Sequence, residues 1–292
     1  MVFYIYLDPA VITRAYERQP YGYQCLIAML RGFAQNCCII DRNGEVSEAL
    51  ADRVRMLPAN SDRKTLKTIL EFLETHGRFI GEADEAADVI IDESGRASLP
   101  IATLGRAEVC SLADYQFTDF EHRRSRVAQG GATYCHAERD GTEFLNLTFR
   151  KALRHARSIT VCDGLLGKEF KENYRYSCER FLEWLAAIHA RREECMVTFK
   201  CIDPDYGKAG PNARVELNSV LEAYSARVRY YSRLPHERFI LTDQMAFEIG
   251  RGMDFLLPAN GRNRDVSIAS KNIRQVIKLV DSYERFLSRD AT

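Results

Sequence analysis

The chain has no excess of charge of either sign and no long apolar run. Among its 292 residues, Lys plus Arg and Asp plus Glu both number 41, so the formal net charge is zero. This balance argues against a protein that coats nucleic acid non-specifically, although it permits a local basic cleft. No stretch approaches the 18 apolar residues of a membrane span, and the apolar segment 2–7 lacks the basic residues that begin a secretion signal. We therefore expect a soluble, cytoplasmic protein.

The sequence also lacks any C-x-x-C pair. Its nine cysteines are odd in number and scattered along the chain. This distribution favours reduced, mostly buried thiols of a cytosolic protein over a disulfide framework. A metal site built from Cys and His has no support from their spacing.

The length is sufficient for two domains of ordinary size. The first, residues 1–130, alternates apolar strands with amphipathic helices and is therefore predicted to be α/β. Its expected elements are strands at 2–7, 37–40 and 87–92 and helices at 19–34 and 63–74. We place the domain junction near residues 125–140, where glycines interrupt the pattern, and we interpret the charged run 121–126 as a solvated surface.

The second domain, residues 140–292, has a more regular pattern and is predicted to be a layered α/β domain. Its expected helices are 142–156, 170–189, 215–225 and 272–287, and its expected strands are 158–162, 195–202, 228–231, 236–242, 246–249 and 266–269. The overall fold class is therefore α/β with two domains.

One short pattern in the second domain points to chemistry. His236, Arg238, Asp243 and Gly250 follow the spacing H-x-R-x4-D-x6-G. Because alternate side chains of a strand face the same way, His236 and Arg238 are expected to point into one cleft. An imidazole can act as a base or nucleophile, and a guanidinium is a fork-shaped donor that keeps its charge at any working pH. This pair suits a phosphodiester.

The spacing resembles the H-x-K-x4-D-x6-G signature of the phospholipase D superfamily. A closer resemblance is to the phospholipase D-like C-terminal domain of MIT-domain proteins, in which H-D-R and a β-hairpin precede I-G-R-G-L-D-x-F. Here the corresponding segments are 236–238 and 249–255, and segment 158–163 resembles that family's first core strand. The resemblance covers about residues 142–292 and implies a phospholipase D-like layered α/β sandwich.

The resemblance implies a role for each residue of the motif. His236 would be the nucleophile that forms a phosphohistidine, Arg238 the phosphate clamp and Asp243 the orienting carboxylate. A second histidine protonates the leaving group in such enzymes, so a chain with one motif would need a homodimer. Arg238 replaces the usual lysine, and Arg251 and Met253 also depart from the enzyme pattern. The MIT-type domains that share these departures are binding modules.

Further residues are expected to bind the ligand. Arg233 and Arg251 flank the motif and could line an anionic groove together with Gly250. Asp163 follows a predicted strand and would border the same cleft, because ligands of α/β sheets gather at the carboxyl ends of strands. Lys271 opens the last helix, where a basic first turn opposes the helix dipole unless a phosphate lies nearby.

The first domain offers an alternative chemistry. Asp8, Asp41, Asp62, Asp88 and Asp92 resemble the carboxylates of a PIN-like nuclease, which converge at strand ends to hold Mg²⁺ or Mn²⁺. Three of them follow predicted strands, but aspartate at that place is also ordinary turn chemistry. We therefore expect no metal and no other cofactor.

Two hypotheses remain. The first is a metal-independent phospholipase D-like phosphodiesterase, a nuclease acting as a homodimer, for which a role in defence or repair would fit. The second is a catalytically inactive phospholipase D-like module that binds a phosphorylated ligand or a protein partner, with residues 1–130 as the adaptor.

Overall fold

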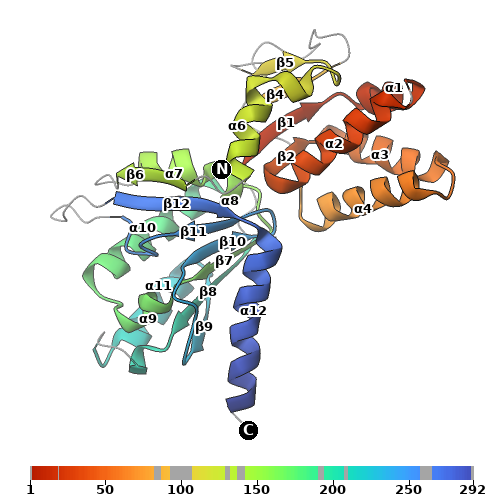
Figure 1. The fold of residues 1–292 in the computed structure, drawn as a ribbon. Helices are drawn as coiled ribbons and strands as arrows, with labels where there is room; N and C mark the ends of the chain where they lie inside the picture. The colour runs from red at the N-terminus through yellow and green to blue at the C-terminus, as the bar shows by residue number, and fades with distance from the viewer. Residues whose placement is uncertain are drawn as a thin grey trace. The chain divides into compact units, whose positions relative to one another are not determined.

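A computed structural model describes residues 2–18, 20–81, 87–92, 107–128, 132–136, 142–189, 194–206, 210–256 and 265–290. The fold is mixed α/β with two sheets, as expected for the fold class. The chain divides into two compact units, residues 2–129 and residues 130–292 (Figure 1).

The N-terminal unit contains a parallel five-stranded sheet in the order β3-β2-β1-β4-β5. Its strands are β1 (Phe3–Leu7), β2 (Cys37–Ile40), β3 (Phe79–Ile80), β4 (Val89–Ile91) and β5 (Glu108–Cys110). Strands β1, β2 and β4 are apolar and buried along nearly their whole length, as expected for a parallel sheet with both faces covered.

The helices of this unit are α1 (Pro9–Glu17), α2 (Tyr21–Asn36), α3 (Glu45–Met56), α4 (Ser61–Thr75) and α6 (Asp119–Ala128), with 3₁₀ turns η1 (Arg42–Gly44) and η2 (Tyr115–Phe117). The sequence patterns did not predict α1 or α3. In α1, Pro9 at the first position has its φ preset for a helix, and Asp8 caps the helix through the backbone N–H of Ala10 at 2.9 Å. The cap of α4 is Asn60, whose side-chain oxygen accepts from the backbone N–H groups of Asp62 and Arg63.

The charged run 121–126 is a solvated surface only in part: His122, Arg123 and Arg126 are exposed, but Arg124 is buried. The run forms most of α6, in which Arg124 is only 4% exposed. The Arg124 guanidinium donates to both oxygens of Glu121 at 2.6 Å and to the carbonyl of Gly32 on α2 at 2.9 Å. A buried arginine is tolerated here because its donors find acceptors, an outcome that charge patterning along one helix does not reveal.

The C-terminal unit contains a seven-stranded mixed sheet in the order β6-β12-β11-β10-β7-β8-β9. Strands β7, β8 and β9 are parallel, and the others pair antiparallel. The strands are β6 (Ala132–His136), β7 (Ser158–Cys162), β8 (Met196–Ile202), β9 (Arg227–Tyr231), β10 (Phe239–Thr242), β11 (Ala246–Ile249) and β12 (Asp265–Lys271).

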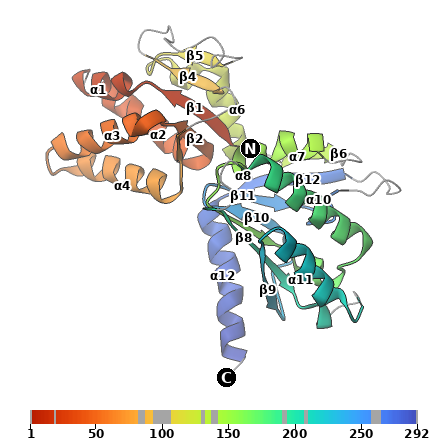
Figure 2. The same ribbon diagram turned by 180° about the vertical axis from the view of Figure 1, so that it is seen from behind.

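Helices lie on both faces of this sheet (Figure 2). They are α7 (Thr142–Thr148), α8 (Arg150–Leu153), α9 (Gly164–Lys168), α10 (Glu172–Ile188), α11 (Ala213–Ala223) and α12 (Ile273–Asp290), with a 3₁₀ turn η4 (Pro204–Tyr206). The single helix expected at 142–156 is two short helices that meet at the buried Phe149. On the opposite face, the start of α12 packs its Ile273, Val276 and Val280 against Phe239, Leu241, Ala246 and Cys162 of the sheet.

Within the described residues, no helix combines the length and apolar character needed to cross a membrane. The eight cysteines whose side chains are described are free thiols, and seven of them are buried. Cys25, on α2, is partly exposed.

Candidate functional site at the carboxyl end of the C-terminal sheet

The topology of the C-terminal sheet determines which predicted site residues can meet. The parallel strands β7, β8 and β9 all end on one side of the sheet, which we call the carboxyl end. Strand β10 runs antiparallel to β7, so β10 begins at this end, and β11 returns to it. Asp163 after β7, Arg238 before β10 and Gly250 after β11 are therefore brought together, as expected for a ligand site in an α/β sheet.

Arg238 is the centre of this group. Its Nη1 donates to the carbonyl of Gly250 at 3.1 Å, and its Nε lies 3.6 Å from Oδ1 of Asp163. The Arg238 side chain is 15% exposed and that of Asp163 is 1% exposed. The guanidinium is thus held in place by a buried carboxylate and a backbone carbonyl, which partly neutralise its charge.

Asp163 is buried but well supplied with donors. Its Oδ1 accepts from the backbone N–H of Leu165 at 2.8 Å, where it caps α9, and its Oδ2 accepts from that of Met253 at 2.7 Å. Burial raises the pKa of the Asp163 carboxyl above its ordinary value, while these N–H donors and the charge of Arg238 oppose the rise. Asp163 therefore organises the site rather than facing a ligand.

The segment that follows β11 closes over this carboxylate. Gly252 has φ +66, and a Cβ there would lie 2.2 Å from both Asp163 Oδ2 and Arg238 Cδ, so only glycine fits. Arg251 donates to Oδ2 of the buried Asp254 at 3.2 Å. Gly252 and Asp254 were not predicted as site residues, although the I-G-R-G-M-D segment was the available signal.

Tyr174 on α10 is a third residue of this site that was not predicted from the sequence. Its side chain is buried, and burial raises the pKa of its phenol. The negative charges of Asp163 and Asp254 raise that pKa further, and the charge of Arg238 lowers it, so Tyr174 lies within electrostatic reach of the whole cluster. Burial and these two negative charges therefore favour the neutral phenol of Tyr174.

His236 does not lie on a strand, which corrects the expected strand at 236–242. Strand β10 begins at Phe239, and His236 and Glu237 form a bend before it. The argument from strand alternation for a shared cleft of His236 and Arg238 therefore does not apply. Both His236 and Arg233 are exposed on the segment that joins β9 to β10, on the carboxyl-end side of the sheet.

Two predicted residues lie at the other end of the sheet. Asp243 follows β10, and its Oδ1 accepts from the backbone N–H of Arg157 at 2.9 Å, where β7 starts. Strand β10 separates it from His236, so it is not placed to orient that imidazole. Lys271 does not open a helix but ends β12, where it pairs with Glu248 at 2.8 Å. The directions of strands β10 and β12 place both residues at this end of the sheet, and the spacing of residues along the chain does not reveal those directions.

The carboxylates of the N-terminal unit also lie at strand ends. Asp8, Asp41 and Asp92 directly follow β1, β2 and β4, three adjacent parallel strands. Asp41 accepts from the backbone N–H of Val46 at 2.7 Å and from the Ser47 hydroxyl at 2.6 Å, in the manner of a turn residue. In the described parts of the chain, no three His, Cys, Asp or Glu side chains are grouped to hold a metal ion.

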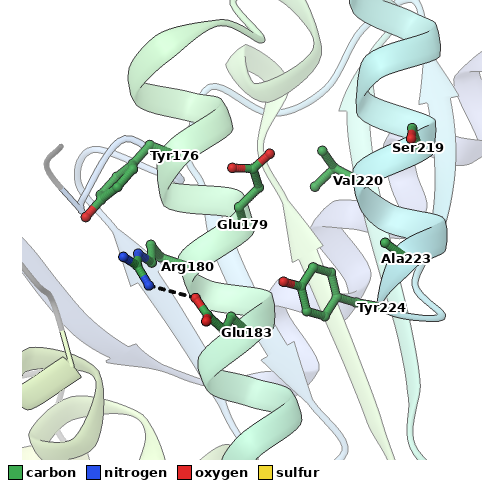
Figure 3. A pocket seen from close by; sticks show the side chains of 8 residues that line it. All are labelled: Tyr176, Glu179, Arg180, Glu183, Ser219, Val220, Ala223 and Tyr224. Carbon is green, nitrogen blue, oxygen red and sulfur yellow. Dashed lines mark hydrogen bonds and ion pairs between the residues drawn. The ribbon is translucent and has the colours of Figure 1, made fainter.

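A groove of about 450 Å³ lies between α10 and α11, on the helical layer. Figure 3 shows Glu179 and Arg180 on one wall and Val220 and Tyr224 on the other. Arg180 pairs with Glu183 at 2.8 Å, so the charges of this groove are largely satisfied within its wall. None of the predicted site residues lines it.

The carboxyl end of the C-terminal sheet thus carries a fixed Arg238, the exposed Arg233 and His236 on the segment before β10, and Arg251, which pairs with Asp254, after β11. This arrangement can accept an anion, since arginine and protonated histidine are donors without acceptor capacity. In comparisons with known proteins, no family model matches the chain, and no curated protein is significantly similar to it.

Proposed function

We propose that the C-terminal unit is a phospholipase D-like module that binds a phosphorylated ligand at the carboxyl end of its sheet without hydrolysing it. The observation that carries the proposal is the fixed position of Arg238, which Asp163 and the Gly250 carbonyl hold at the end of the sheet where Arg233 and His236 are exposed. A preorganised guanidinium loses little freedom on binding a phosphate, so it suits recognition.

The same geometry favours binding over catalysis. A phosphohistidine mechanism needs an imidazole oriented by a carboxylate and a phosphate clamp free to follow the transition state. Here Asp243 is bonded to the start of β7, and Arg238 is already engaged by Asp163. His236 lies exposed in a bend before β10, where it can donate to an anion.

The test uses the full chain, EDTA and bis(p-nitrophenyl) phosphate, which reports binding by calorimetry and cleavage by colour. We expect saturable binding without release of p-nitrophenolate. His236→Ala and Arg233→Gln should each weaken binding about fivefold, since an exposed ionic contact contributes about 1 kcal/mol. His122→Ala is the matched control, because His122 is an exposed histidine of the N-terminal unit.

Two results would contradict the proposal. Turnover in EDTA that His236→Ala abolishes would support the homodimeric phosphodiesterase instead. Absence of binding, or equal effects of His236→Ala and His122→Ala, would remove the anion site altogether.

A further inference from the structure

Strand β9 carries two exposed arginines, Arg227 and Arg229, that have no role in the proposed anion site. Strand β9 and the residues after it read Arg227, Arg229, Tyr231 and Arg233 at alternate positions, and we call these four residues the β9 stripe. Alternate residues of a strand share a face, so Arg227, Arg229 and Tyr231 lie in line at intervals of about 6.6 Å.

The stripe lies on a face of the sheet that helices leave accessible at this strand. The other face of β9 is covered by α11, since Tyr230 donates to Asn218 at 2.7 Å. On the stripe's face, Arg227 and Arg229 are exposed, and Met196 beside them on β8 is 52% exposed. The described apolar cluster of α12 on that face contains residues of β7, β10 and β11 and, packed against them, Leu234 of the segment after β9.

The stripe places positive charge on the last strand of the sheet. Arg229 lies opposite Lys200 of β8 in the parallel register of the two strands. Within the described residues, Arg229 takes part in no ion pair, and the contact of Arg227 is with the sulfur of Met196 at 3.9 Å. The arginines therefore present their donors to solvent.

We infer that the β9 stripe binds the backbone of single-stranded nucleic acid and leads it to the anion site at the carboxyl end. Arg227 and Arg229 at alternate positions of β9, followed by Arg233 beyond its end, can contact successive phosphates of an extended strand, and Tyr231 offers an aromatic ring for a base. The stripe ends at Arg233, one of the residues of the proposed site. The inference rests on the proposed function in that it names the polymer that carries the bound phosphate.

The geometry distinguishes this ligand from other polyanions. A duplex presents its phosphates along two curved strands, whereas Arg227 and Arg229 lie along one β-strand. An acidic peptide would match the charges but would leave the aromatic position without a stacking partner. Both are arms of the test.

The experiment measures the binding of the full chain to fluorescein-labelled oligo(dT) and oligo(rU) of 20 nucleotides by anisotropy at several KCl concentrations. The double variant R227Q/R229Q should weaken binding to all sequences and flatten the slope of log K against log salt by about 1.4, which is about 0.7 for each lost phosphate contact of a single strand. R227K/R229K keeps the charge and should retain the slope.

The matched control is R175Q/R180Q, which removes the same charge from two exposed arginines on α10, outside the stripe. It should leave the affinity and slope unchanged. Equal effects of the two Gln variants would overturn the inference, as would tighter binding of a duplex or of polyglutamate. Unchanged affinity with self-association of R227Q/R229Q would overturn it too and assign the arginines to protecting an edge strand.

The experiment tests the proposed stripe and the proposed anion site separately. R227Q/R229Q should still bind bis(p-nitrophenyl) phosphate, while H236A should weaken that binding about fivefold and retain most of the salt slope. If the small ligand does not bind but the oligonucleotide depends on Arg227 and Arg229, the proposed site is wrong and the stripe stands.

Discussion

At the scale of single residues, the site depends on one buried carboxylate. Asp163 accepts hydrogen bonds from the backbone N–H of its near neighbour Leu165 and from that of Met253, which is distant in sequence, and it pairs with Arg238. Each of these contacts supports the others, because the donors stabilise the charge that in turn fixes the guanidinium. The sequence contained both residues, but the ion pair itself follows only from strand direction.

We predict that Arg238→Ala lowers the free energy of unfolding by about 3 kcal/mol, because it leaves a buried carboxylate without its cation. The pKa of Asp163 is raised in the folded protein, so the stability from this group is full below its ordinary pKa and is lost as pH rises through the raised value. Arg238→Ala should deepen that loss. Urea unfolding at neutral and at acidic pH should therefore show a larger penalty at neutral pH.

Arg180→Ala is the control for this prediction, since Arg180 forms an exposed ion pair and should cost about 1 kcal/mol or less. A pH-independent penalty for Arg238→Ala would show that Asp163 does not depend on Arg238 for its charge.

Gly252 provides a second test at this scale. Both Gly252→Ala and Gly210→Ala place a side chain at positive φ, with a strain of about 1–2 kcal/mol. Only at Gly252 would the new Cβ meet Asp163 and Arg238, which should add about 1–3 kcal/mol of overpacking. Chemical denaturation of the two variants measures the difference, and equal penalties would mean that the segment after β11 is not closed over the site.

At the scale of secondary-structure elements, buried polar contacts decide how helices attach. Helix α6 buries Phe120 in the apolar core that α2 also lines, and Arg124 ties the two helices together by donating to the Gly32 carbonyl and to Asn36. Gly32 permits this approach, since a Cβ there would lie 3.0 Å from the Arg124 guanidinium.

We predict that Arg124→Ala destabilises the N-terminal unit by about 3–5 kcal/mol, because Glu121 loses its buried partner. Hydrogen exchange should speed up in α2 and α6. Arg123→Ala, at an exposed position of the same helix, should change exchange little. Slow exchange of α2 in the Arg124 variant would show that apolar contacts alone hold the two helices together.

At the scale of the whole molecule, equal numbers of acidic and basic residues mean that any anion binding is local. The proposed contacts are made by arginine and histidine side chains, which need no metal ion. We predict that EDTA leaves oligonucleotide binding unchanged and that millimolar Mg²⁺ weakens it by competing for phosphates. Binding or cleavage that requires Mg²⁺ or Mn²⁺ would instead direct attention to Asp8, Asp41 and Asp92.

Prediction from the sequence succeeded where the signal was local. The apolar runs at β1, β2, β7 and β8 and the amphipathic stripes of α4 and α10 were recognised, because each depends on a periodicity within a few residues. Helices α1 and α3 and strand β6 were missed, since a cap, a proline or long-range pairing defines them more than an apolar pattern does.

The sequence by itself determined the alternation of elements that makes the chain α/β, the spacing of His236 and Arg238, and the alternate arginines of β9, because these properties depend only on neighbouring residues. Tertiary structure alone decided which of those residues meet. The antiparallel pairing of β10 with β7 brings Asp163 to Arg238 and places Asp243 at the far end of the sheet. Strand direction in a sheet results from packing and pairing across the whole unit, so no local pattern encodes it.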